Sequence, residues 1–71
     1  MATRVEAQVT GTVWKIERQE GEVLAEGDVI LILESMKMEI PVEAPAAGVL
    51  AEIRVAEGKI VEEGAILALI E

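Results

Sequence analysis

The chain has 71 residues, of which 52% are hydrophobic, and it contains no His, Cys, Tyr or Phe. The formal net charge of −8 argues against binding to nucleic acid or to an anionic membrane surface, because both need clustered Lys and Arg. The absence of His and Cys argues against a zinc site, a disulfide and a catalytic site built from the usual bases and nucleophiles.

Eight short β-strands are predicted along the chain. Glycines at positions 11, 21, 27, 48, 58 and 64 mark turns, and segments rich in Val, Ile and Leu lie between them. Apolar and polar residues alternate over 13–17 and 53–55, which is typical of half-buried strands. The predicted strands are 4–9, 12–17, 22–25, 29–34, 39–44, 49–55, 60–62 and 66–70. An alternative interpretation makes 22–26 and 59–63 single helical turns.

The sequence repeats itself at a spacing of 37 residues. The matching pairs are Val5/Val42, Glu6/Glu43, Ala7/Ala44, Gly11/Gly48, Ile16/Ile53, Glu20/Glu57, Gly21/Gly58, Glu26/Glu63, Gly27/Gly64 and Glu34/Glu71. Three glycine pairs fall in register, which is difficult to obtain by chance, and a repeat of this kind indicates two copies of one structural unit. Two copies of four strands predict an all-β fold in which two small sheets face each other about a pseudo-twofold axis.

The size of the chain predicts one domain over residues 1–71, with the copies at about 2–34 and 39–71. Because Glu71 is the repeat equivalent of Glu34, the fold is expected to be complete. The acidic residues Glu57, Glu62 and Glu63 are expected to keep the domain monomeric. The longest apolar run, 29–33, is too short to span a membrane, and residues 1–4 lack the apolar core of a signal peptide. A cytoplasmic location is therefore expected.

Residues 35–38 join the two copies, and the simplest connection is a tight hairpin with Met36 and Lys37 at its tip. The expected register pairs Ser35 with Met38, Glu34 with Glu39, Leu33 with Ile40 and Ile32 with Pro41. Pro41 then occupies a position that is not hydrogen-bonded, where its missing N–H has little cost on an edge strand.

This predicted turn is made from unfavourable residues. Two-residue hairpins favour Asn-Gly or Asp-Gly, because both central residues usually need a positive φ. Met36 and Lys37 do not have that preference, and Glu34 would face Glu39 across the strands. Local choices that contradict the local structure are typical of functional sites. The competing interpretation is that the methionines fill the end of the core and Lys37 is an ordinary solvated side chain.

The segment Glu34-Ser35-Met36-Lys37-Met38 resembles the biotin-attachment motif of biotin carboxyl carrier domains, in which Ala or Ser precedes Met-Lys-Met. The resemblance extends to the framework of the family, namely Gly11-Thr12-Val13-Trp14-Lys15, Gly21 with Val23 and Gly27, and Ala44-Pro45-Ala46-Ala47-Gly48-Val49. It implies a flattened β-barrel, or barrel-sandwich hybrid, of two four-stranded antiparallel sheets. Residues 7–10 depart from the Ala-Pro-Met-Pro of many relatives, and the uninterrupted repeat leaves no room for the "thumb" insertion of some acetyl-CoA carboxylase carriers.

The resemblance also implies a function for the hairpin. Biotin would be joined by an amide bond to the Lys37 amine by a biotin-protein ligase, and would then carry a carboxyl group from a biotin carboxylase site to a carboxyltransferase site. Met36 and Met38 would serve ligase recognition, with Glu34 and Ser35 as weaker candidates. Because an exposed lysine amine is almost fully protonated at neutral pH, the ligase would have to remove the proton. The domain itself is expected to have no catalytic residues and no metal.

The sequence leaves other functions open. A lipoyl carrier would have the same fold, although lipoyl domains typically show Asp-Lys-Ala at the tip, and lipoate could be a secondary modification of Lys37. An unmodified interaction module, like that of export adaptors, would not need the lysine, and an autonomous enzyme is the least favoured class. Trp14 is interpreted as a packing residue at the sheet surface, with docking of partners as the alternative. The acidic residues Glu57, Glu62 and Glu63 are interpreted as a solvated face.

Overall fold

In a computed structural model that describes residues 2–71, the chain forms eight β-strands. These are β1 (Thr3–Glu6), β2 (Gly11–Ile16), β3 (Val23–Leu24), β4 (Val29–Ser35), β5 (Met38–Glu43), β6 (Gly48–Ile53), β7 (Ile60–Val61) and β8 (Ile66–Ile70). Within residues 2–71 there is no helix, and hence none long enough to cross a membrane. The alternative of helical turns at 22–26 and 59–63 is therefore wrong, because β3 and β7 lie there.

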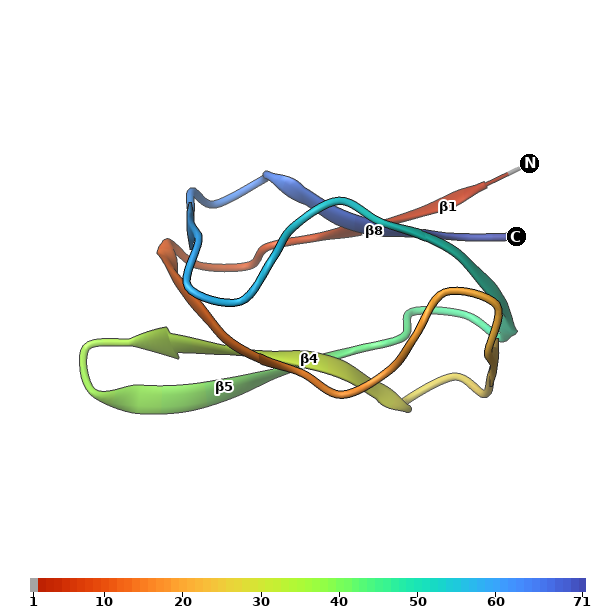
Figure 1. Cartoon of the computed structure of the whole chain (residues 1–71), viewed down its shortest axis with the longest axis horizontal. Coiled ribbons are helices and arrows are strands. Elements are labelled where there is room, and N and C mark those ends of the chain that lie inside the picture. Colours follow the sequence, from red (N-terminus) through yellow and green to blue (C-terminus); the bar gives the residue numbers. More distant parts are fainter. Residues whose placement is uncertain (1) are drawn as a thin grey trace.

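The strands form two four-stranded antiparallel sheets that face each other. One sheet has the order β1-β8-β6-β3 and the other has the order β5-β4-β2-β7. Figure 1 shows the two layers, with β1 and β8 above β4 and β5. Side chains from both layers, such as Val13, Leu33, Leu50 and Ile70, meet in a core from which water is excluded. The expected barrel-sandwich is confirmed, as a pair of sheets rather than a closed barrel.

The repeat explains the order of the strands. A shift of 37 residues converts β1 into β5, β2 into β6, β3 into β7 and β4 into β8, because Gly11 becomes Gly48 and Val29 becomes Ile66. The same shift converts the order of one sheet into the order of the other. Each sheet therefore contains two strands from each copy. Neither copy has a complete sheet of its own, so the two must fold together.

Hydrogen bonds are exchanged between the copies at equivalent positions. The Ile16 N–H donates to the Glu57 carboxylate at 2.9 Å, and the Ile53 N–H donates to the Glu20 carboxylate at 2.8 Å. The backbone repeats the pattern, with Gly21 N donating to Leu50 O and Gly58 N donating to Val13 O, both at 2.7 Å. Residues that are identical in the two copies, such as Glu20 and Glu57 or Gly21 and Gly58, thus bond to the opposite copy. Glu57 accepts a bond, so it does more than contribute to a solvated face.

The hairpin and the chain ends lie at opposite ends of the molecule (Figure 1). The pairing of β4 with β5 is the repeat equivalent of the pairing of β8 with β1, and both ladders are interrupted at the same place. The first ladder is closed by a turn, whereas the second is open where the chain begins and ends. The molecule is 32 Å long, and the pseudo-twofold axis thus places the turn at residues 36–37 at the end far from the first and last strands.

Two equivalent glycines allow strands to come unusually close. A Cβ on Gly11 would lie 2.6 Å from the carbonyl oxygen of Glu34, and a Cβ on Gly48 would lie 2.6 Å from that of Glu71. Because these obstacles are backbone atoms, they cannot rotate away. We expect Gly11→Ala and Gly48→Ala each to lower the free energy of unfolding by about 1–3 kcal/mol. Urea denaturation measures the change. Gln8→Ala, at an exposed side chain, is the control and should stay within about 0.5 kcal/mol of wild type.

Candidate functional site

The β4–β5 hairpin has the register that the sequence predicts. The four pairs nearest its tip are Ser35↔Met38, Glu34↔Glu39, Leu33↔Ile40 and Ile32↔Pro41. β5 is the edge strand of its sheet, as the missing N–H of Pro41 requires. Met36 and Lys37 form the two-residue turn. The prediction of a tight hairpin with the lysine at its tip is therefore confirmed.

The turn holds two ordinary L-residues in the left-handed region. Met36 has φ 51° and Lys37 has φ 64°, and they are the only residues other than glycine with positive φ among residues 2–71. Each such residue costs about 1–2 kcal/mol relative to a right-handed conformation. A type I′ turn needs this geometry at both positions, because its twist matches that of the strands. The hairpin therefore keeps its side chains at the tip at the expense of stability.

The side chains at the tip are presented to solvent. Met36 is 92% exposed and Met38 is 62% exposed, so the interpretation that they fill the end of the core is wrong. Lys37 is also exposed, and it forms no hydrogen bond or ion pair with any residue of 2–71. Its amine is free to enter the active site of another protein.

The base of the hairpin is attached to the rest of the fold. The Ser35 hydroxyl donates a hydrogen bond to the carbonyl oxygen of Thr10 at 2.9 Å, and the Thr10 hydroxyl accepts one from the Glu63 N–H at 3.2 Å. Gly11 lies against the last residues of β4, as described above. These contacts give Ser35 a structural role and fix the direction in which the tip projects. Glu34 and Glu39 are exposed opposite each other just below it.

The five residues singled out in the sequence, 34–38, are thus gathered at one end of the molecule. Trp14, interpreted as a packing residue, lies on β2 of the same sheet and is 48% exposed. Within residues 2–71 no group of three or more acidic side chains is placed to hold a metal ion.

A groove of about 390 Å³, which the sequence pattern does not predict, lies between the edge strands β1 and β5. Its lining includes Val5, Glu6, Val42 and Glu43, which are two repeat-equivalent pairs. The repeat could have indicated it, because a pseudo-twofold axis brings equivalent edge strands together.

Comparison with known proteins gives one family over nearly the whole chain. The model of the family described as "Biotin-requiring enzyme" matches residues 9–70.

Individual relatives agree with the family match. The chain is 48% identical over 42 residues to "Biotinylated protein TB7.3 homolog" of Mycobacterium leprae, over 59% of this chain and 59% of the relative. It is 45% identical over 38 residues to "Biotin/lipoyl attachment protein" of Bacillus subtilis, over 54% of this chain and 52% of the relative. The match thus spans little more than half the length of these relatives.

A solved structure extends the likeness to the whole fold. The chain superimposes on part of the crystal structure of the Kluyveromyces lactis urea carboxylase with a TM-score of 0.96 and 32% identity. The match covers 100% of this chain but only 6% of that protein. In the urea carboxylase, the same two-sheet fold is a small part of a large enzyme.

The strain in the turn predicts a stabilising variant. Replacing Met36 by Asn and Lys37 by Gly supplies the residues that a type I′ turn prefers. We expect this double variant to raise the free energy of unfolding by about 1–2 kcal/mol, measured by urea denaturation. Lys37→Arg is the control and should leave stability unchanged within about 0.5 kcal/mol, because it keeps the same backbone preference. An Asn-Gly variant no more stable than wild type would show that the turn is not strained.

Proposed function

The chain belongs to the family of biotin-requiring enzymes, and on that basis we propose that it is a biotin carboxyl carrier with biotin attached to Lys37. It is a biotin attachment domain of the kind found in biotin-dependent carboxylases. The observation that carries the choice of residue is the turn itself. Lys37 stands at the tip of a two-residue turn, exposed, with a positive φ that a simple surface loop would not require.

The other lysines have less suitable surroundings. Lys15 lies within β2, with its amine 3.7 Å from the Glu17 carboxylate. Lys59 lies in the connection before β7, where its carbonyl oxygen accepts a hydrogen bond from the Val13 N–H. The Lys37 amine projects from the narrow tip of a hairpin and can enter a deep active site, whereas the Lys15 amine lies on the broad face of a sheet and cannot.

The proposed attachment is an acyl transfer to the Lys37 amine. After the ligase has taken a proton from the ammonium group, the lone pair of Nζ attacks the acyl carbon of biotinyl-adenylate. The new amide bond forms as the bond to the adenylate phosphate breaks, AMP leaves, and the nitrogen gives up its second proton to solvent. This chain contributes the nucleophile and its position, while the ligase contributes the base. Met36 and Met38 flank the amine with exposed flexible side chains that can adapt to an apolar enzyme surface.

Attached biotin would supply a carrier for a carboxyl group between a biotin carboxylase site and a carboxyltransferase site. The role of the chain in that cycle is to keep the base of the hairpin rigid, through the hydrogen bond between Ser35 and Thr10. The Lys37 side chain and the attached group would remain mobile. A tether of this kind raises the local concentration of the carried group at successive sites without new contacts. A carboxylase component is proposed here because the solved structure that this fold matches is a urea carboxylase.

Lipoate is the weaker candidate for the same amine. The family description and the name of the mycobacterial relative both specify biotin, whereas the Bacillus relative is named for both groups. Biotin is therefore the modification that we propose.

We expect one biotinyl group on wild type and none on Lys37→Arg after incubation with a biotin-protein ligase, biotin and ATP. Intact mass measures the number of groups added. Arginine keeps the positive charge but is not a nucleophile at neutral pH, so it removes only the chemistry. Lys59→Arg is the matched control and should accept one group like wild type.

A folded wild-type domain that accepts no biotin would contradict the proposed function. Parallel incubation with a lipoyl ligase and lipoate would then decide whether Lys37 takes the other group. A biotinyl group that persists on Lys37→Arg would assign the site to another amine.

A further inference from the structure

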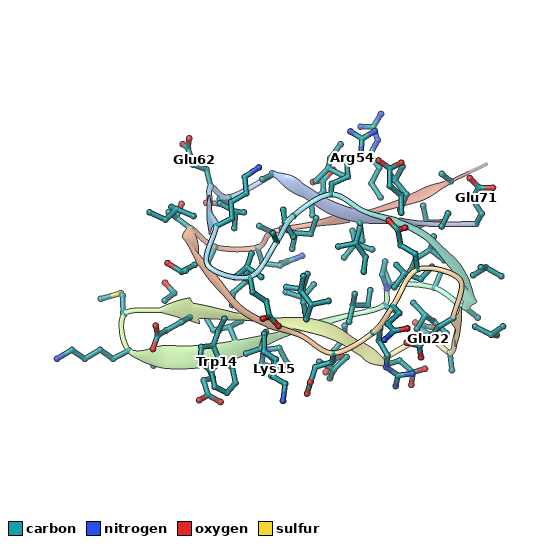
Figure 2. The ribbon with its side chains drawn as sticks, viewed as in Figure 1. Trp14, Lys15, Glu22, Arg54, Glu62 and Glu71 are labelled. Atoms are coloured by element: carbon teal, nitrogen blue, oxygen red, sulfur yellow. The ribbon has the colours of Figure 1, made fainter. Side chains whose placement is uncertain are left out.

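The outer face of the hairpin sheet carries a large aromatic side chain. Val13, Leu31 and Leu33 are fully buried between the sheets. Between the irregularity at Ile30, which is also buried, and the hairpin, the side chains that alternate with them on β2, β4 and β5 point outwards. We call this surface the Trp14 face. It consists of Thr12, Trp14, Lys15, Ile32, Glu34, Glu39 and Pro41. Figure 2 shows Trp14 and Lys15 pointing away from the body of the molecule on the side of β4 and β5.

The repeat shows that the fold does not need tryptophan at this position. Trp14 occupies the irregular position of β2, between Val13 and Lys15 in the ladder with β4. The equivalent irregularity of β6 lies between Leu50 and Glu52, and the residue there is Ala51. Both residues are exposed. One scaffold position thus holds alanine in one sheet and a half-exposed tryptophan in the sheet that carries Lys37.

Charge also distinguishes the two outer faces. The Trp14 face has Glu34 and Glu39, with no side-chain partner for either among residues 2–71, against the single cation Lys15. The equivalent positions of the other sheet hold Glu71, Ala2 and Glu52, but that sheet also has Arg4 and Arg54 where the hairpin sheet has Pro41 and Glu17. With these residues included, the side-chain charges sum to −2 on the Trp14 side and to zero on the other. The Trp14 face is therefore the acidic one, and an aromatic side chain with acidic neighbours suits a basic partner surface that has an apolar recess.

Area requires such a partner to extend beyond the tip. A specific interface buries about 800 Å² on each partner, a large share of the 4486 Å² of this chain. The hairpin tip alone is too small to provide it, so an enzyme that binds there must also cover one flank. At about 3.3 Å per residue, the Ile32↔Pro41 pair beside Trp14 lies roughly 15 Å from the tip, within the footprint of such an interface.

We propose that the Trp14 face is the docking surface for the enzyme that acylates Lys37, and this rests on the proposed function. The indole of Trp14 enters an apolar recess of the ligase, and Glu34 and Glu39 meet Lys or Arg side chains at its rim. The ligase is the partner that must come closest, because it has to bring the Lys37 amine itself within bonding distance of an acyl carbon. Later partners need to reach only the far end of a long tether.

The test is the steady-state rate of biotin transfer by a biotin-protein ligase to Trp14→Ala. We expect kcat/KM for the carrier to fall about tenfold or more, mainly through KM, because buried aromatic anchors dominate interfaces. Trp14→Phe should restore most of the loss. Val23→Ala, at a 77% exposed apolar residue of β3 in the other sheet, is the control and should match wild type. Circular dichroism verifies that each variant is folded at the assay temperature.

Electrostatics provides a second readout that a merely structural role for Trp14 would not affect. Glu39→Lys and Glu26→Lys make the same change in net charge, at exposed residues on the Trp14 face and in the loop before β4. β4 runs from that loop towards the hairpin, so the loop lies at the opposite end of the molecule (Figure 1). We expect Glu39→Lys alone to raise KM severalfold, and added salt to raise KM for wild type more than for this variant.

The outcomes separate the two proposals. Biotin on wild type together with equal rates for wild type and folded Trp14→Ala would overturn the docking surface and leave the proposed function intact. If Glu39→Lys and Glu26→Lys raised KM equally, the effect would come from net charge alone. That result would contradict a specific contact of Glu34 and Glu39 with the ligase. Failure of wild type to accept biotin would overturn both proposals.

Discussion

The two copies of the sequence are joined by hydrogen bonds that each donates to the other. Ile16 and Ile53 each donate to a glutamate of the opposite copy, and the backbone repeats the exchange. Each sheet takes two strands from each copy, so the chain cannot complete one sheet without the other. This sharing, rather than a large core, suits a 71-residue chain that has no disulfide. It also determines where the hairpin with Lys37 lies, because the axis that relates the copies puts the turn and the chain ends at opposite ends of the molecule.

The hairpin departs from the rules that the rest of the fold obeys. The turns at Gly21, Gly27, Gly58 and Gly64 use glycine for positive φ, whereas the exposed turn uses Met36 and Lys37. The scaffold tolerates this because β4 is paired on both sides and Ser35 anchors the end of the strand. A rigid base with a strained tip presents one amine in a defined direction. The proposed attachment of biotin gives a reason for retaining residues that cost stability.

The near-symmetry of the molecule makes its differences informative. Where the copies have identical residues, as at Gly11 and Gly48, the contact is structural. Where equivalent positions differ without a change in the backbone, as at Trp14 and Ala51, the fold gives no reason for the difference. Of these two, Trp14 lies on the sheet that carries Lys37 and Ala51 lies on the other. The proposed carrier function would require several enzymes to bind the domain in turn, and the proposed docking surface would give them one distinctive face on an otherwise repetitive body.

The sequence by itself determined the strands, the repeat, the hairpin register and the position of Lys37 at the tip, because these depend on local patterns and on a spacing of 37 residues. It placed the first strand too far along, at 4–9 instead of Thr3–Glu6, because Ala7 leaves the ladder to bond with Ala65. Only the tertiary structure decided that the methionines are exposed, that Glu57 accepts a hydrogen bond from Ile16, and that a groove separates β1 from β5. Each of these depends on how far one sheet extends over the other and on which side chains meet across the two copies. Those distances arise only when strands far apart in the chain are packed together.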